Sequence, residues 1–342
     1  MKQIDERTVM FSRMLLKEGT KDYETYYSLH PEHKEVDDQL RAMPNLASPG
    51  TAMYNSLTAP IAEADFSIIE QLRPLCEGEV AKEQVGIEPE AATALVKKLM
   101  LHYGADEVAI TEIKPYHYYS VRGRGEYGRA IETHHKYAIV FTKEMSKDLV
   151  NRAPKMSTMI ETSDKYLKLG VMGLQLATYL RSIGYASRNH MDGNYLVIAP
   201  LVAQDAGLGE IGRHGLLLTP QYGGRQRLGV VTTDLELQAD VVKKMNLSDF
   251  CDYCGRCIRT CPGKAIPTEK KVINGVLRYQ IDQESCYTRW RSLGTDCGIC
   301  LSSCPISQGV DLALLKKKDY KEIIRQYTEE YPIRPYIKED YF

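Results

Sequence analysis

The chain has no long apolar stretch and almost no net charge. No run approaches the ~18 consecutive apolar residues that suggest a membrane-spanning helix, so we expect no transmembrane segment. The formal net charge is -1 over 342 residues, which leaves no overall basic field to attract nucleic acid. Low-complexity tracts are absent. A chain of this length suits two or three globular domains.

The N-terminus lacks the features of an export signal. Residues 1–19 contain acidic side chains, no apolar core segment and no twin arginine. Eight of the nine cysteines gather between residues 251 and 304, and Cys76 stands alone. Thiolates kept free for metal binding favour a reducing compartment over a disulfide scaffold. We therefore expect a cytoplasmic protein.

The eight clustered cysteines form two runs, each of which ends in Cys-Pro. The first has the spacing C-x2-C-x2-C-x3-C-P and contains Cys251, Cys254, Cys257 and Cys261. The second contains Cys286, Cys297, Cys300 and Cys304. Such runs are typical of ferredoxins with two [4Fe–4S] clusters, in which the fourth cysteine of each run ligates the other cluster. One predicted ligand set is therefore Cys251, Cys254, Cys257 and Cys304, and the other is Cys286, Cys297, Cys300 and Cys261.

Structural zinc and disulfides are the alternatives for these cysteines. A zinc site takes four ligands, commonly as two C-x2-C pairs. It explains neither the C-x3-C-P endings nor the division of eight cysteines into two fours. The second run departs from the ferredoxin pattern, because ten residues separate Cys286 from Cys297.

Helix and strand patterns alternate in the segment before the cysteines. Apolar periodicity predicts helices over 91–103 and 163–183, with Leu95 on one face of the first, and strands over 107–113, 134–141 and 228–232. Residues 1–85 are broken by proline and glycine, so we expect an irregular segment with short helices that wraps a core. A further helix is expected over 320–329. The alternation favours an α+β protein.

We divide the chain into four parts on these patterns. Residues 1–85 form the N-terminal wrapping segment, and residues 86–245 form an α/β core. Residues 246–310 form a ferredoxin-like domain with two clusters, and residues 311–342 form a C-terminal tail.

The predicted helix over 163–183 has two distinct faces. Thr162 or Ser163 can cap its start, and Leu167, Val171 and Leu174 form an expected core stripe. The other face carries Tyr166, Gly170 and Gly173. A glycine inside a helix costs about 1 kcal/mol relative to alanine, so close approach by something large is expected. That neighbour is either a cofactor or another element of the protein.

Three further glycine-rich segments are candidate ligand sites. Residues 123–128 match G-x-G-x-x-G, but a strand follows them instead of the helix that would bind a pyrophosphate, so a dinucleotide loop is rejected. The segments around Gly207 and Gly209 and around Tyr222 and Gly223 allow backbone amides to approach a flat ligand. Structural turns alone also account for them.

The sequence AGLGEIGR at 206–213, followed by LLLTPQYGGRQRLGVVTTDLEL at 216–237 and the two cysteine runs, resembles the corrinoid iron–sulfur reductive dehalogenases. The resemblance covers about residues 85–310 and extends to the wider superfamily that includes the epoxyqueuosine reductases. It implies a nitroreductase-like α/β core that binds cobalamin in the base-off form, with two [4Fe–4S] clusters that pass electrons to it. The missing twin arginine places the chain with the shorter, cytoplasmic type.

The resemblance also implies site residues. Tyr166 opens a helix that ends in an R-x-x-G-Y element at 181–185 and corresponds to a proton donor. Arg227, or alternatively Arg225, is the basic residue after the T-P-x-Y-G turn, and Asn194, or alternatively Asn189, precedes AGLGE. A nearby cation eases proton release from a tyrosine, whose usual pKa is about 10. Cofactor contacts are expected at Gly170, Gly173, Gly207, Gly209, Tyr222 and Gly223.

The sequence thus predicts an oxidoreductase that replaces a carbon-bound halogen by hydrogen. Its partners are a small organohalide-like substrate and an external electron donor such as ferredoxin or flavodoxin. One alternative keeps the cofactors but reduces an epoxide or a modified nucleoside. Another is an electron-transfer protein without chemistry of its own.

Overall fold

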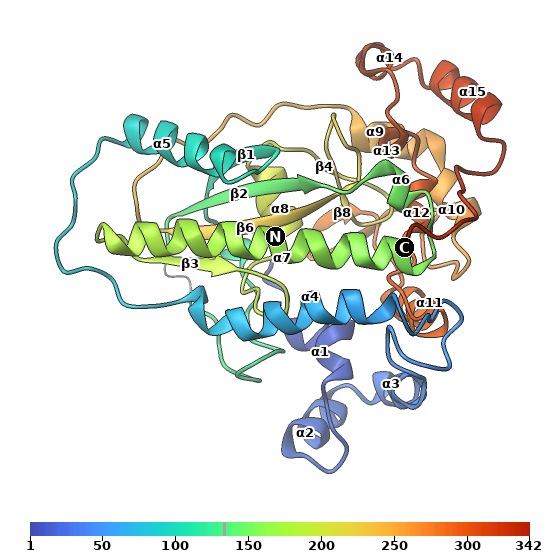
Figure 1. The fold of residues 1–342 in the computed structure, drawn as a ribbon, viewed down its shortest axis with the longest axis horizontal. Coiled ribbons are helices and arrows are strands. Elements are labelled where there is room, and N and C mark those ends of the chain that lie inside the picture. Colours follow the sequence, from blue (N-terminus) through green and yellow to red (C-terminus); the bar gives the residue numbers. More distant parts are fainter. Residues whose placement is uncertain (133–134) are drawn as a thin grey trace.

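A four-stranded antiparallel sheet lies at the centre of the protein (Figure 1). The computed structural model describes residues 1–132 and 135–342. The strand order is β1-β2-β6-β3, with bounds β1 (Glu107–Glu112), β2 (Tyr137–Glu144), β6 (Gln226–Thr233) and β3 (Ser187–His190). Ile139 of β2 pairs with Ile110 of β1 and with Val231 of β6. Directly opposed residues share a face, so these three apolar side chains point into one core.

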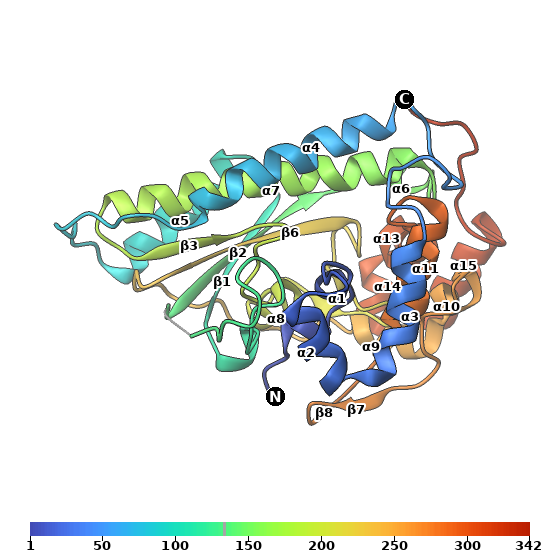
Figure 2. The same cartoon turned by 90° about the horizontal axis from the view of Figure 1, so that it is seen from below.

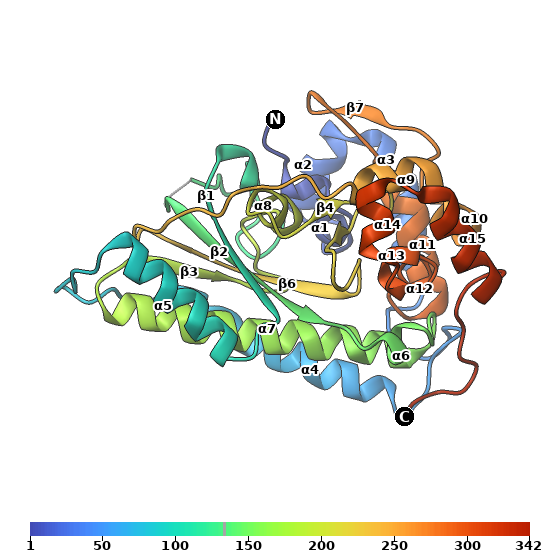
Figure 3. The ribbon, with the colours of Figure 1, turned by 90° about the horizontal axis from the view of Figure 1, so that it is seen from above.

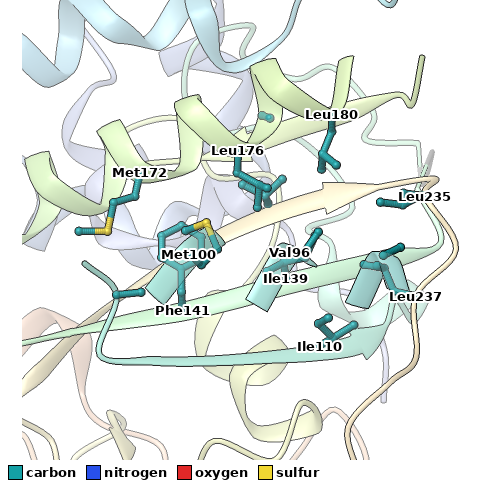
Figure 4. Close-up of a cluster of buried hydrophobic side chains, with 14 of the residues drawn as sticks. Val96, Met100, Ile110, Ile139, Phe141, Met172, Leu176, Leu180, Leu235 and Leu237 are labelled. Carbon is teal, nitrogen blue, oxygen red and sulfur yellow. The ribbon is translucent and has the colours of Figure 1, made fainter. Parts of the chain in front are cut away.

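Two helices cover that face of the sheet. They are α5 (Pro89–His102) and α7 (Met156–Ser182). Figure 4 shows Val96 and Met100 from α5 meeting Leu176 and Leu180 from α7 above the strands. A further helix, α4 (Ala59–Leu72), runs along the outer side of α7 (Figure 2).

The opposite face of the sheet packs against α8 (Ala199–Asp205) (Figure 3). Ala138 and Val140 of β2 and Val230 of β6 meet Val202 and Ala203 of this helix in a second core. Helices on both faces of an antiparallel sheet confirm the predicted α+β class. The start of β6 lies near the cysteine-rich domain, because Arg227 on this strand contacts Asp296.

Helix α7 differs from its prediction in two respects. It begins at Met156, so Thr162 and Ser163 are buried inside it and do not cap it. Ser163 donates a hydrogen bond of 2.6 Å to Asp65 of α4. The predicted core stripe is wrong at Val171, which is 40% exposed, while Leu174 is buried. The sheet and α4 contact different sides of α7, so its buried surface is wider than one stripe.

The remaining core elements follow the predicted order. In α5 the buried residues are Ala92, Val96 and Met100, which corrects the face assigned through Leu95. The strand expected from residue 134 begins at Tyr137, and His134 lies outside the described residues. Short elements in this region are η3 (Pro115–His117), α6 (Lys147–Val150), β4 (Glu210–Ile211) and β5 (Leu217–Leu218).

The N-terminal segment is more regular than its proline and glycine content predicted. Its elements are η1 (Glu6–Thr8), α1 (Met10–Met14), α2 (Lys21–Leu29), α3 (Pro31–Ala42), α4 and η2 (Arg73–Cys76). The breaks fall between helices, so α3 and α4 form without interruption. A fully buried ion pair of 2.6 Å joins Arg13 to Asp37, and Arg13 also reaches Glu284 at 2.8 Å. This segment therefore contacts both the core and the cysteine-rich domain.

The cysteine-rich domain consists of short helices and one small hairpin. Its elements are α9 (Leu247–Cys254), α10 (Arg256–Thr260), β7 (Lys271–Ile273), β8 (Val276–Arg278), α11 (Gln283–Leu293), α12 (Ile299–Ser302) and α13 (Pro305–Gln308). The tail adds α14 (Leu312–Lys317) and α15 (Tyr320–Glu330), the latter as predicted. In the described parts of the chain, no helix has the length and apolar character needed to cross a bilayer.

Candidate functional site

The structure brings the eight clustered cysteines together in two groups. The thiols of Cys251, Cys254 and Cys257 lie close enough to Cys304 to interact electrostatically with it. In the same way, those of Cys286 and Cys297 interact with Cys261. Cys300 interacts with members of both groups, so the groups are neighbours. This grouping is consistent with the two sets expected from the ferredoxin rule, and the assignment of each cysteine to a cluster stays a prediction.

The spacing of the sulfur atoms argues against a mononuclear metal. All nine cysteines are free in the structure. A tetrahedral zinc with Zn–S bonds of about 2.3 Å would bring its sulfurs to about 3.8 Å from one another. Within residues 1–132 and 135–342, no three cysteine sulfurs lie within 4.8 Å of one another. A four-iron cluster is larger than one ion and fits the wider arrangement.

Burial makes these thiols poor acids. It raises the pKa of Cys251 to about 12 and that of Cys254 to about 11. In the second group it raises the pKa of Cys286 to about 12 and that of Cys297 to about 11. A thiol coordinating a metal ion loses its proton because the metal charge compensates the desolvated thiolate. The donor set therefore fits iron–sulfur clusters.

A pocket of about 190 Å³ lies in the core, where β6 and α7 approach the segments that follow β3 and α8. Its polar lining comes from Tyr119, Arg124, Tyr166, Tyr195, Gln226 and Arg227. Its apolar lining comes from residues 197–200, Leu216, Leu217 and Leu228. A more open hollow of about 430 Å³ lies between α9 and α15, away from these residues. We take the smaller pocket as the candidate site, because it contains two of the predicted catalytic residues.

Tyr166 and Arg227 meet in this pocket, as predicted. The guanidinium carbon of Arg227 on β6 lies 5.1 Å from the ring centre of Tyr166 on α7, a cation–π geometry. Nη2 of Arg227 donates to Thr162 Oγ1 at 2.7 Å and to Asp296 Oδ2 at 2.9 Å. Thr162 lies one turn before Tyr166 on α7, so the helix positions both contacts of the arginine.

The tyrosines of the pocket are held in the protonated form. Burial raises the pKa of Tyr166 above its usual value, and the charge of Arg227 opposes this rise. Burial also raises the pKa of Tyr119 to about 12. Among the described residues, Tyr166 meets Arg227 through the face of its ring, and no hydrogen bond engages its hydroxyl. The hydroxyl is therefore available to donate a hydrogen bond to a molecule in the pocket, and its role as proton donor stays a prediction.

Neither predicted asparagine lines the pocket. The side-chain oxygen of Asn194 accepts hydrogen bonds of 2.9 Å from Arg122 and from Arg188. The amide of Asn189 donates to the carbonyl of Gly170 at 3.1 Å, which ties β3 to α7. This corrects the expectation of an asparagine beside Tyr166. The alternative cation, Arg225, is also engaged elsewhere, because it donates to Glu144 and to the backbone of Ser307.

The predicted cofactor glycines approach other parts of the protein. A Cβ on Gly173 would lie 2.0 Å from Asn189 Oδ1, and one on Gly170 would lie 2.7 Å from Met191. Both contacts come from β3, so tight packing accounts for these glycines.

The turn glycines and Tyr222 are likewise explained by the protein itself. A Cβ on Gly209 would lie 2.0 Å from the carbonyl oxygen of Leu218, and one on Gly223 would lie 2.4 Å from the backbone of Ser307. Gly207 adopts a left-handed φ of +80° after α8. Tyr222 belongs to the turn at Thr219 and lies outside the pocket lining.

Several lining residues were not assigned to the site from the sequence. Arg124 belongs to the glycine-rich segment 123–128, and its Nε donates to buried Glu6 at 2.7 Å. Tyr195 follows β3 and donates to the carbonyl of Leu228 at 3.2 Å. The glycine pattern around Arg124 gives no reason to place it here, and Tyr195 is one of 23 tyrosines in the chain. Only the assembled sheet brings them next to Tyr166.

The pocket does not enclose a corrinoid as it stands. Pockets that enclose a drug-sized ligand have volumes of about 300–1,000 Å³, and a corrinoid exceeds that size. At about 190 Å³ the pocket fits a small organic molecule beside Tyr166. A corrinoid would need space beyond it.

Comparisons with known proteins agree with what the cysteine groups and the pocket indicate. Residues 250–310 match the family described as "4Fe-4S dicluster domain". A tetrachloroethene reductive dehalogenase from Desulfitobacterium hafniense is 32% identical over 181 residues, which cover 49% of this chain and 32% of that protein. The structure of the catabolic reductive dehalogenase NpRdhA superposes with a TM-score of 0.75 at 25% identity, over 96% of this chain and 48% of that one. The chain is related to the reductive dehalogenases.

The similarity covers only part of the length of these relatives. The match spans about a third of the curated reductive dehalogenases and about half of the solved one. An epoxyqueuosine reductase from Lactococcus garvieae is 30% identical over 116 residues, 32% of each chain. The reductive dehalogenases and the epoxyqueuosine reductases therefore both bear on the activity.

Proposed function

We propose that this chain is a cobalamin-dependent, reductive dehalogenase-like oxidoreductase that replaces a carbon-bound halogen by hydrogen. The reaction consumes two electrons and one proton and releases a halide ion. Two [4Fe–4S] clusters held by the eight cysteines supply the electrons. The substrate is a small organohalide, and an external donor such as ferredoxin or flavodoxin reduces the clusters.

The contact between Arg227 and Tyr166 in the pocket wall carries this proposal. Tyr166 offers a hydroxyl that is not engaged by the described residues. Arg227 stays protonated at any pH the protein tolerates, so its charge can offset the phenolate left when Tyr166 gives up its proton. The proton would be transferred from the hydroxyl oxygen of Tyr166 to the carbon that loses the halogen.

The remaining pocket residues orient the substrate. Leu216, Leu217 and residues 197–200 provide an apolar surface that excludes water. Tyr119 and Tyr195 add polar groups at fixed positions. A bound corrinoid would supply the reducing metal centre for the carbon–halogen bond.

A second candidate substrate class is an epoxide or a modified nucleoside. The match to an epoxyqueuosine reductase favours it. The cofactors would be the same, and the product would differ.

The first experiment is anaerobic purification with cobalamin added, followed by metal analysis. We expect about one cobalt and about eight irons per chain, because two four-iron clusters hold eight irons. Iron without cobalt, even after reconstitution, would reject the corrinoid part of the proposal and leave an iron–sulfur protein. Lysozyme treated with cobalamin in parallel provides the control for non-specific uptake.

The second experiment identifies the substrate class with chemically reduced protein. The panel contains tetrachloroethene, 3-bromo-4-hydroxybenzoic acid and an epoxide, and halide release is measured by ion chromatography. The first two compounds are named with relatives or structures that this chain resembles. Halide release supports dehalogenation, whereas epoxide reduction without halide release would favour the second candidate. No turnover of any compound, with both cofactors bound, would favour an electron-transfer role.

A further inference from the structure

Asp296 connects the cysteine-rich domain to the pocket. Its carboxylate oxygen Oδ2 accepts hydrogen bonds from Thr162 at 2.6 Å and from Arg227 at 2.9 Å. The side chains of Asp296 and Arg227 are only 8% and 14% exposed. A carboxylate and a guanidinium this deeply buried stabilise each other only in a well-formed, hydrogen-bonded pair. The pair is joined through Nη2 and Oδ2, while Nε of Arg227 and Oδ1 of Asp296 have no hydrogen-bond partner among the described residues.

The backbone turns sharply at this point. Gly294, Cys297 and Gly298 all have left-handed φ angles, of +79°, +61° and +69°. Cys297 is not a glycine, so its conformation is strained and must be held by its surroundings. Cys297 N–H donates to Thr295 Oγ1 at 3.3 Å, and Thr295 Oγ1 donates to the carbonyl of Pro154 at 2.7 Å. The loop is thus anchored to the core just before α7.

Adjacent residues of this loop serve different centres. The thiol of Cys297 faces the cysteine group that contains Cys261 and Cys286. The carboxylate of Asp296 faces Thr162 and Arg227. Cys297, a predicted cluster ligand, is therefore adjacent in the backbone to Asp296, which contacts Arg227 beside Tyr166.

We propose that Asp296 is a positioning residue that holds Arg227 over Tyr166 and places a fixed negative charge beside the cluster ligated by Cys297. The inference rests on the proposed function for its effect on turnover. Its electrostatic effect on the cluster does not require turnover. Arg227 lies between Asp296 and Tyr166, so Asp296 acts through the arginine.

The test compares Asp296→Asn with wild type, both as the holoprotein with clusters assembled. Asparagine keeps the size of the side chain and removes its charge. Removing a negative charge near a cluster favours its reduced form, so the potential of the cluster held by Cys261, Cys286, Cys297 and Cys300 should rise. We expect the ratio of reduced to oxidised cluster at a fixed potential to increase at least about threefold. Redox titration followed by EPR measures this ratio for each cluster separately.

The second readout is turnover with the substrate found above. Loosening Arg227 should lower kcat about tenfold or more and leave KM within about twofold, because proton donation and not substrate binding is affected. Asp296→Glu should restore the cluster potential, since it restores the charge. Its recovery of kcat should be incomplete, because the longer side chain shifts Arg227.

The matched control is Thr162→Val, which removes one hydroxyl of the same hydrogen-bonded group without changing any charge. It should lower kcat by a smaller factor and leave both cluster potentials unchanged. Thr162 is not adjacent to a cysteine, so this variant also tests the positioning role if Asp296→Asn fails to assemble its cluster. An unchanged cluster potential in Asp296→Asn would overturn the electrostatic part of the inference. Unchanged kcat in both variants would overturn the positioning part.

Failure of the proposed function gives a different pattern. If wild-type protein releases no halide and reduces no epoxide, the proposed reaction is rejected. The rise in cluster potential in Asp296→Asn is still expected in that case, because it depends only on the charge beside Cys297.

Discussion

The guanidinium carbon of Arg227 lies 5.1 Å from the ring centre of Tyr166, and both residues line the same pocket. The two residues are 61 positions apart and come from β6 and α7, respectively. Asp296 and Thr162 fix the arginine from the other side. The contact between Arg227 and Tyr166 makes Tyr166 the strongest candidate for the proton donor.

Tyr166→Phe tests this role while keeping the ring and its packing. General acid catalysis typically contributes ~10²–10⁴-fold, and we expect a loss of that size in turnover. The clusters and substrate affinity should be unchanged, because the hydroxyl has no partner among the described residues. Single-turnover product formation from chemically reduced protein measures the step without electron supply. A rate within about threefold of wild type would transfer the role to Tyr119, which lines the same pocket.

The pH profile gives an independent check on Tyr166. Burial raises the pKa of this tyrosine above its usual value of 10, so the protonated, active form persists through neutral pH. We expect a single-turnover rate that is flat from pH 6 to 9 and falls only above pH 10. In Tyr166→Phe, the residual rate should lack this alkaline fall. A fall centred near pH 7 in wild type would point to a histidine or another acid.

Arg227 variants separate charge from geometry. Arg227→Lys keeps a cation beside Asp296 but loses the planar fork, so we expect a moderate loss of turnover. Arg227→Met should approach the loss seen for Tyr166→Phe, because both residues belong to one functional unit and their effects need not add. It also leaves buried Asp296 unpaired, which costs about 3–5 kcal/mol of stability. Iron content and thermal unfolding of each variant distinguish the catalytic loss from unfolding, and equal rates for Lys and Met would show that charge is irrelevant.

Features of the structure that depend on nearby residues were predicted better than features that depend on contacts between distant residues. The spacing of the cysteine runs predicts two groups, and neighbouring thiols in the structure are consistent with that grouping. Helix α5 and strands β1 and β6 follow from apolar periodicity. The helix pattern places Tyr166 on a face with two glycines, but only the family resemblance suggests a role for Tyr166 and Arg227.

The errors come from contacts that a local pattern does not contain. Helix α7 is contacted by the sheet and by α4, so its buried surface includes Thr162 and Ser163 and leaves Val171 exposed. Asn194 was placed by its distance from the AGLGE motif, but the turn after β3 directs it toward Arg122 and Arg188. The rest of the pocket lining comes from segments as distant as residues 119 and 217, and only the tertiary fold brings them together.

Cys254→Ala tests the cluster assignment, with Cys76→Ala as its control. Cys254 belongs to the group with Cys251, Cys257 and Cys304, so its loss should remove one cluster and about half of the iron. Stability should also fall, because metal-binding energy contributes to folding. Cys76 of η2 is buried in a core with Ile69 of α4 and Leu174 of α7 that contains none of the eight clustered cysteines, and its replacement should leave iron unchanged. Unchanged iron and EPR spectra in Cys254→Ala would reject this ligand set.

Gly173→Ala decides between the two explanations of the small face of α7. The added Cβ would lie 2.0 Å from Asn189 Oδ1. Asn189 is fully buried and donates to the Gly170 carbonyl, so it cannot move aside without losing that hydrogen bond. Packing alone therefore predicts a loss of about 1–3 kcal/mol in the free energy of unfolding.

Gly86→Ala is the matched control for this variant. No atom lies within 4 Å of a Cβ at Gly86, so alanine there should be neutral or stabilising by up to about 1 kcal/mol. Chemical denaturation of both variants, with clusters present, measures the difference. If Gly173→Ala is as stable as wild type but fails to take up cobalamin, α7 must separate from β3 in the working protein. The glycine would then face the cofactor, and the pocket beside Tyr166 would be larger than about 190 Å³.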